Sequence, residues 1–286
     1  MATANTLERI FSVDYKSKIQ PIVSVCKRGM RLGNLRGAKG VTGVTIDNST
    51  GDIYVADHWK CCVKVFDCNG QIMFIFGDEE GEGKMFCPIG LAICRDRILI
   101  SQRTHCILNY QLNGKFISRI GKPGKGELEF DHPRSLTFDE SNGEVYICDP
   151  GNNRIQILSK ELTYKTQFGQ DNLKYPLDVK VTKEFIYILD ASNPGLHLYN
   201  YNLILHRSII SRGDGLQLMN PKFFCIDNSN NIHITDYYSN SISSFNSQFD
   251  LIDKISLTSP AGITVDNTGR VIVACNGGQH RLNMFW

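Results

Sequence analysis

The sequence contains no apolar run that approaches the roughly 18 residues needed to cross a bilayer. Its opening stretch, MATANTLERI, also lacks the charged start and the apolar core of a secretory signal. Neither sign of charge is in excess, because 31 Lys and Arg offset 29 Asp and Glu to a net charge of +2. These absences predict a cytoplasmic, or else nuclear, protein without a membrane partner. They also argue against a global attraction to nucleic acid or anionic lipid.

The ten cysteines are scattered and form no CxxC pair, the spacing typical of zinc sites and redox motifs. Several lie inside apolar runs such as VYICD and FFCID, where a free thiol behaves as a small core residue. We therefore expect free thiols, as in a reducing compartment. A secreted, disulfide-linked chain is the less favoured alternative, and the lone sequon Asn48-Ser49-Thr50 does not change this, because such tripeptides are common by chance.

Helical periodicity is missing as well, since no window of about 11 residues keeps apolar positions at the spacing of a helix face. A hairpin pattern recurs instead: a short apolar run, an Asp, a polar turn with Gly or Asn, and a second run rich in β-branched and aromatic residues. Four clear copies lie at 43–57, 135–149, 224–236 and 262–275, and two weaker copies lie at 91–102 and 179–190.

A proline precedes most copies, at intervals of 39 to 45 residues: Pro88, Pro133, Pro176, Pro221 and Pro260. A third apolar stretch follows each hairpin, and a fourth, ending in glycine, follows in at least three copies. Four short antiparallel strands in a unit of about 44 residues are typical of a propeller blade. The sequence predicts an all-β, six-bladed β-propeller with approximate repeats at 41–77, 78–121, 122–169, 170–210, 211–256 and 257–286.

The sixth repeat ends after its third predicted strand, so it lacks a partner at its outer edge. Residues 19–26, IQPIVSVC, have the composition of a strand and precede the first repeat. We expect this segment to pair as the outermost strand of the sixth blade and so to close the ring. The expected propeller domain is then 16–286, and 1–15 is expected to form a mobile tail.

These repeats resemble the NHL repeat, in which an Asp, a Gly turn and a second Asp are followed by Asn, Arg and Gln. Segment 133–158 carries most of this pattern, through Asp139, Gly143, Asp149, Asn152, Arg154 and Gln156. The resemblance implies a six-bladed recognition platform like the C-terminal domain of TRIM-NHL ubiquitin ligases, which binds RNA or protein. No zinc-spaced Cys/His cluster or heptad region is present to form a RING, B-box or coiled coil. Ligase activity is therefore not expected from this chain alone.

Two sets of polar residues could carry metal chemistry. An Asp closes the second strand of four repeats (Asp57, Asp149, Asp190 and Asp236), and we expect these carboxylates to accept hydrogen bonds from turn amides. Four histidines, His58, His105, His132 and His280, fall in loops that a propeller places on one face. They are weak candidates for a zinc site like that of the peptide-amidating lyase, a family relative, so a metal-dependent lyase is a second alternative.

Against this alternative, such lyases are secreted and disulfide-bonded, and the histidines come from different blades. The glycine-rich segment 77–84, GDEEGEGK, fails the phosphate-loop spacing and carries four acids, so no nucleotide cofactor is expected. No GxSxG elbow or isolated carboxylate pair is found. The sequence thus predicts no catalytic residue, no cofactor and no bound metal.

Recognition is the remaining function, because the same predicted face carries aromatic and basic residues. They are Trp59, Lys60, Arg103, Arg134, Arg154, Lys222, Tyr237, Tyr238 and Arg281. These residue types favour protein interfaces and also single-stranded RNA. Basic residues gather at 27–39 and acidic residues at 78–82. Because the expected surface carries both signs of charge, it favours a protein partner over a uniform polyanion. We expect a protein-binding platform, such as the substrate-recognition part of a TRIM-NHL-type ligase; an RNA-binding post-transcriptional regulator is the first alternative.

Overall fold

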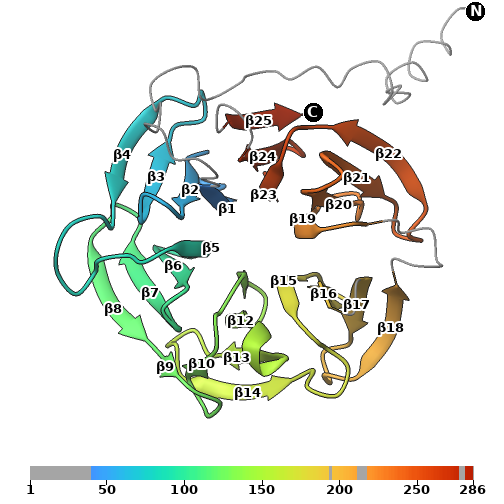
Figure 1. Ribbon diagram of the computed structural model, residues 1–286, viewed down its shortest axis with the longest axis horizontal. Coiled ribbons are helices and arrows are strands. Elements are labelled where there is room, and N and C mark those ends of the chain that lie inside the picture. Colours follow the sequence, from blue (N-terminus) through green and yellow to red (C-terminus); the bar gives the residue numbers. More distant parts are fainter. Residues whose placement is uncertain (1–39, 193–194, 211–217, 277–280, 286) are drawn as a thin grey trace, which may run out of the picture.

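The computed structural model describes residues 40–192, 195–210, 218–276 and 281–285. In these residues, antiparallel sheets stand around a central axis as the blades of a propeller (Figure 1). Five blades have four strands each, and the sixth has three described strands. The predicted all-β, six-bladed propeller is confirmed. The described chain contains no helix long and apolar enough to cross a membrane.

The strands follow one another from the axis outward in each blade. The first blade has β1 (Val41–Ile46), β2 (Ile53–Asp57), β3 (Cys62–Phe66) and β4 (Ile72–Phe76), and the second has β5 (Pro88–Cys94), β6 (Arg97–Gln102), β7 (Cys106–Gln111) and β8 (Phe116–Ile120). The third has β11 (Leu136–Asp139), β12 (Glu144–Asp149), β13 (Arg154–Leu158) and β14 (Tyr164–Phe168), and the fourth has β15 (Pro176–Val181), β16 (Ile186–Asp190), β17 (Gly195–Tyr199) and β18 (Leu205–Ile210). The fifth has β19 (Pro221–Ile226), β20 (Ile232–Asp236), β21 (Ser241–Phe245) and β22 (Leu251–Ser256), and the sixth has β23 (Pro260–Val265), β24 (Val271–Cys275) and β25 (Arg281–Phe285).

The core lies between neighbouring blades. The second strands are largely buried on both faces because a neighbouring blade covers each face, and β2 is buried along its whole length. The outer strand β8 instead alternates between half-buried and exposed residues. One apolar cluster joins Tyr54 and Val65 of the first blade to Ile98 and Leu108 of the second.

The first and last blades also share a core, so the two ends of the described ring are joined. Val44 and Ile53 of the first blade pack in one cluster with Ile272 and Leu282 of the sixth. The strand predicted at 19–26 lies outside the described residues, as do the tail at 1–15 and the basic strip at 27–39. Pairing of 19–26 with the sixth blade therefore stays a prediction.

Glycines let the inner strands approach one another closely. A register shift interrupts β1, β5 and β23 near their starts, and a glycine occupies each interruption. A Cβ atom at Gly43 would lie 2.4 Å from the carbonyl oxygen of Ile89. One at Gly90 would lie 2.6 Å from that of Arg134, and one at Gly262 would lie 2.2 Å from that of Thr42. Each glycine thus faces the backbone of the next blade.

Two local features, a pair of short strands and a 3-10 turn, were not predicted from the sequence. In the connection between the second and third blades, β9 (Lys122–Pro123) and β10 (Glu129–Phe130) pair in parallel. A 3-10 turn, η1 (Pro150–Asn152), links β12 to β13. Both features lie beside Arg154, whose side chain is buried.

Candidate binding face

The antiparallel order of the strands places two sets of connections on one side of the ring. These are the turns between the second and third strands of each blade and the links from one blade to the next. We call this side the loop face. The turns between first and second strands, and between third and fourth strands, lie on the opposite face.

Most of the predicted binding residues that are described are accessible on the loop face. Trp59 and Tyr238 are 50% and 64% exposed, and Lys60 and Arg103 are exposed as well. Three others, Arg134, Lys222 and Tyr237, are half-buried. Arg281 begins β25, and its side chain lies outside the described atoms.

The half-buried members are held by ring contacts. The guanidinium carbon of Arg134 lies 6.0 Å from the centre of the Tyr175 ring, and Nζ of Lys222 lies 5.7 Å from that of Tyr237. Tyr237 in turn meets Tyr238 edge to face, with 5.7 Å between ring centroids. These contacts fix the direction of the cations before any partner binds.

Arg154 does not belong to the loop face, and its placement there was wrong. Its side chain is only 2% exposed, and its Nε donates to Oδ2 of Asp149 over 2.8 Å. The terminal nitrogens donate to the carbonyl oxygens of Lys125, Gly126 and Glu129 at 2.6, 3.0 and 2.7 Å. Every donor points into the protein, so none is left for a ligand.

The four Asp residues that close second strands are buried and hold the loop face in place. Asp190 accepts a hydrogen bond from the Lys174 amide at 2.7 Å, and Asp236 accepts one from the Met219 amide at 2.6 Å. Asp149 accepts one from the Asp131 amide at 2.7 Å. Each of these bonds ties the link between blades to a second strand. Asp57 holds its own turn, through the Lys60 amide at 3.1 Å.

Two exposed apolar residues of the loop face were missed from the sequence. Phe86 is 45% exposed in the link from β4 to β5, and Met219 is 75% exposed in the link from β18 to β19. Both stand two residues before the proline that opens a blade, outside the alternating pattern of any strand. An apolar side chain at that position, just before a blade-opening proline, was the signal in the sequence that could have identified them.

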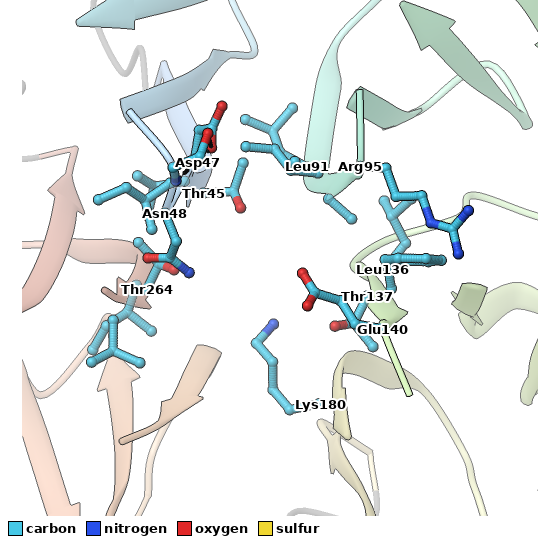
Figure 2. Close-up of a pocket in the computed structure, with 18 residues that line it drawn as sticks. Thr45, Asp47, Asn48, Leu91, Arg95, Leu136, Thr137, Glu140, Lys180 and Thr264 are labelled. Carbon is cyan, nitrogen blue, oxygen red and sulfur yellow. Dashed lines mark hydrogen bonds between the residues drawn. The ribbon is translucent and has the colours of Figure 1, made fainter. Parts of the chain in front are cut away.

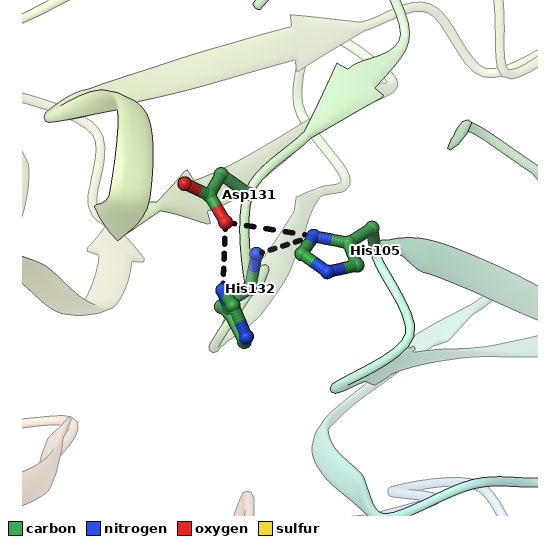
Figure 3. Close-up of side chains that lie close together, drawn as sticks. All are labelled: His105, Asp131 and His132. Carbon is green, nitrogen blue, oxygen red and sulfur yellow. Dashed lines mark hydrogen bonds and ion pairs between the residues drawn. The ribbon is translucent and has the colours of Figure 1, made fainter. Parts of the chain in front are cut away.

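The structure brings together two of the four candidate histidines. His105 of the β6–β7 turn and His132 of the following link lie beside Asp131, with 4.4 Å between the imidazole centroids (Figure 3). His58 lies at another junction, where its Nδ1 is 3.3 Å from the carbonyl oxygen of Pro88, and burial lowers its pKa. His280 lies outside the described residues.

A central pocket of about 560 Å³ opens on the opposite face. Inner strands and their turns line it, and Figure 2 shows Thr45, Thr137, Thr264, Glu140 and Lys180 around a common space. The Lys180 ammonium is 2.7 Å from Oδ1 of buried Asp178, which neutralises this cation. The lining mixes hydroxyl, acidic and basic groups. No residue of this pocket was among the predicted site residues.

Comparison with known proteins matches both the repeat and the ring. The sequence profile of the NHL repeat matches residues 40–66 and 130–158. Brain tumor of Drosophila melanogaster is 27% identical over 158 residues, covering 53% of this chain and 14% of that protein. NHL repeat-containing protein 3 of Mus musculus is 24% identical over 193 residues, covering 59% of this chain and 55% of that protein. The chain thus spans less than two thirds of either relative.

Several solved structures share this fold over most of the chain. A gluconolactonase from Xanthomonas campestris superposes with a TM-score of 0.68 at 15% identity, over 87% of this chain and 86% of its own. A chain of the nidogen–laminin complex superposes with a TM-score of 0.67 at 18% identity, over 79% of this chain and 85% of its own. Streptogramin B lyase superposes with a TM-score of 0.63 at 13% identity, over 88% of this chain and 95% of its own. At such identities these neighbours, two of them enzymes, establish the fold alone. Together with the repeat matches, the ring of blades shows that this chain is a six-bladed β-propeller that contains NHL repeats.

Proposed function

We propose that the loop face is a rigid platform that binds a protein partner. The observation that carries the proposal is the exposure of four large side chains on this face, Trp59, Phe86, Met219 and Tyr238. Large aromatic and Met side chains are enriched in protein interfaces, where a few of them supply most of the binding energy. Exposed Arg103 adds the cation that most often accompanies such residues.

Rigidity of the platform supports the same proposal. Buried Asp236 anchors the link that carries Met219, and the buried Gln102 side chain accepts a hydrogen bond from the Phe86 amide at 2.8 Å. A surface that is ordered before binding loses less conformational entropy when a partner docks. Loops on a fixed scaffold are also the usual place for recognition residues.

The charge of the face favours a protein over a polyanion. The acidic loop that contains Asp78, Glu79 and Glu80 belongs to the link between the first and second blades. Exposed Arg103 lies on the same face. A surface that carries both signs suits a partner of mixed charge. The resemblance of the repeats to those of TRIM-NHL ubiquitin ligases supports the further proposal that, within a longer protein, this platform selects a substrate for ubiquitin transfer.

A cytoplasmic location is proposed with this function. The nine cysteines of the described residues are all free, although several lie within the core. Free thiols in this number suit a reducing compartment. Fluorescence microscopy of the tagged chain tests this, and retention in the secretory pathway would contradict it.

The test compares capture of cellular proteins by the wild-type chain and by single variants. Trp59→Ala and Tyr238→Ala are expected to lose the partner that the wild type retains, by at least tenfold in affinity for a central contact. Ile117→Ala is the matched control, because Ile117 is 46% exposed on outer strand β8, away from the loop face. A partner retained equally by all variants, or lost with Ile117→Ala alone, contradicts the proposal.

RNA is the second candidate, favoured by Arg103 and by Arg134 beside the Tyr175 ring. Fluorescence anisotropy with single-stranded and stem-loop RNA pools would separate the two. Binding that weakens steeply with salt and disappears in the Arg103→Ala, Arg134→Ala double variant would favour RNA. No binding at low salt would exclude it.

A further inference from the structure

Three side chains from two blades meet at the junction of the second and third blades. One nitrogen of His105, one nitrogen of His132 and one oxygen of Asp131 all lie within 4.8 Å of one another. Oδ1 of Asp131 is 2.7 Å from Nδ1 of His132 and 3.5 Å from Nδ1 of His105 (Figure 3). All three residues are half-buried, so solvent reaches them.

The neighbouring backbone holds this group in position. The Asp131 amide donates to the buried Asp149 carboxylate at 2.7 Å, and its carbonyl oxygen accepts from the Gly151 amide at 3.0 Å. A Cβ atom at Gly151 would lie 2.3 Å from Oδ2 of Asp131, so glycine there leaves room for the carboxylate. Nδ1 of His105 accepts a hydrogen bond from the His132 amide at 3.2 Å, which holds the imidazole in place and leaves this nitrogen unprotonated. Supporting contacts of this kind orient ligands around a metal.

The architecture of the blade junction does not by itself require three such residues. At two other junctions, one side chain before a third strand accepts a hydrogen bond from the amide that precedes the next blade. The Cys87 amide donates to Sγ of Cys61 at 3.4 Å, and the Ser259 amide donates to Oδ1 of Asn240 at 2.8 Å. His105 and the His132 amide repeat this bond at 3.2 Å. The bond uses only one side chain, so it leaves the His132 imidazole and the Asp131 carboxylate unexplained.

We infer that His105, Asp131 and His132 bind a zinc ion on the loop face. Imidazole nitrogen and carboxylate oxygen are ordinary zinc ligands at about 2 Å, which places the ligand atoms of a tetrahedral site roughly 3.3 Å apart. The ligand atoms now lie within 4.8 Å of one another, and small rotations of these half-buried side chains bring them to roughly 3.3 Å. Three protein ligands leave the fourth position to water or to a carboxylate or imidazole of a docked protein.

Zinc titration of the metal-free, full-length chain by isothermal titration calorimetry tests the inference. We expect one zinc per chain. Three substitutions, His105→Asn, His132→Ser and Asp131→Asn, should each weaken binding at least tenfold. The first two place in this junction the residues that stand at its equivalent in the fifth and sixth blades, Asn240 and Ser259, which share the left-handed backbone of His105 and His132. These changes remove ligands with little strain.

Two control variants separate this site from other zinc ligands. His206 is exposed on β18 and stacks on Phe185, so His206→Ala should leave the affinity unchanged. The Cys61→Ser, Cys87→Ser double variant removes the thiols at the first junction and should also bind normally. Zinc should raise the melting temperature of the wild type and of both controls, and not that of the three ligand variants.

The inference is overturned if the wild type binds no zinc, if the three substitutions leave the affinity intact, or if binding is lost with the cysteine pair. It does not depend on the proposed partner, because the titration uses purified chain alone. Loss of a partner with Trp59→Ala and loss of zinc with Asp131→Asn are separate outcomes, so either proposal can fail while the other stands.

Discussion

Arg154 shows how a residue that looks suited to binding can instead serve the fold. Its guanidinium pairs with buried Asp149 and donates to three carbonyl oxygens of the link that contains β9 and β10. A charge in such a place is stable only while all of its partners remain. Removing the side chain would leave the buried Asp149 carboxylate without its charged partner and would take a donor from each of the three carbonyl oxygens.

Arg154→Ala is therefore expected to lower the free energy of unfolding by about 3–5 kcal/mol. Arg154→Lys should also destabilise the chain, because an ammonium group cannot supply the five directed donors of a guanidinium. Urea denaturation measures both effects. Exposed Arg119 provides the control, and Arg119→Ala should change stability by less than about 0.5 kcal/mol. Equal stability of the Arg154 and Arg119 variants would contradict this role.

The cysteines differ in reactivity because burial differs from one to another. Burial raises the pKa of Cys62 and of Cys275 to about 12, and it raises that of Cys148 well above its usual value. Only a thiolate attacks alkylating reagents quickly. Among the described cysteines, Cys68 is exposed and should be labelled first. Mass spectrometry of peptides from briefly treated native protein measures this order; labelling of Cys148 before denaturation would contradict it.

The inner strands depend on glycine where one blade meets the next. At Gly90 a side chain would meet the Arg134 carbonyl, and neither backbone can move without shifting its sheet. Gly90→Ala should therefore cost about 1–3 kcal/mol of stability, the range for added volume in a packed core. Gly126→Ala is the control, because its Cβ would meet only the flexible Glu129 side chain. Thermal unfolding of the two variants tests this, and equal midpoints would contradict it.

The strands were predictable because each leaves a local signal. Alternating or continuous apolar runs, a proline before five of the six blades and glycine turns identified the sheets and their number. The burial of Arg154 was not predictable in this way, because its carbonyl partners lie 25 to 29 residues earlier and in no regular pattern. The approach of His105 to Asp131 could not be predicted for the same reason. Contacts between blades depend on how loops fold over one another, which spacing alone does not encode.

The complete ring is held by links between blades as well as by its core. The Asn228 side chain donates to the Asn267 carbonyl at 3.1 Å, which joins the fifth and sixth blades. The Asn267 amide donates to Oδ1 of Asn48 at 3.1 Å, which joins the sixth to the first across 219 residues. Each turn in this series follows an Asp, and two of these acids, Asp227 and Asp266, have shifted pKa values.

Acid should weaken this part of the ring. Desolvation acts to raise the pKa of Asp227, but hydrogen bonds from His233 and Asn231 outweigh it and lower the pKa to about 2, from an ordinary value of 3.8. The pKa of Asp266 is also lowered, because hydrogen bonds from Thr268 and Arg270 outweigh its desolvation. A lowered folded-state pKa stabilises the fold above the unfolded value, and this contribution is lost as pH falls through the folded value.

The melting temperature should therefore fall as the pH drops from about 4 to about 2, beyond the change due to other carboxylates. Asp227→Asn should be less stable than the wild type at neutral pH and should lose less stability over that interval, since it has no proton to take up. Asp250→Asn, which alters an exposed carboxylate on the link between β21 and β22, should follow the wild-type curve. Parallel curves for the wild type and Asp227→Asn would show that this carboxylate does not couple protonation to the stability of the ring.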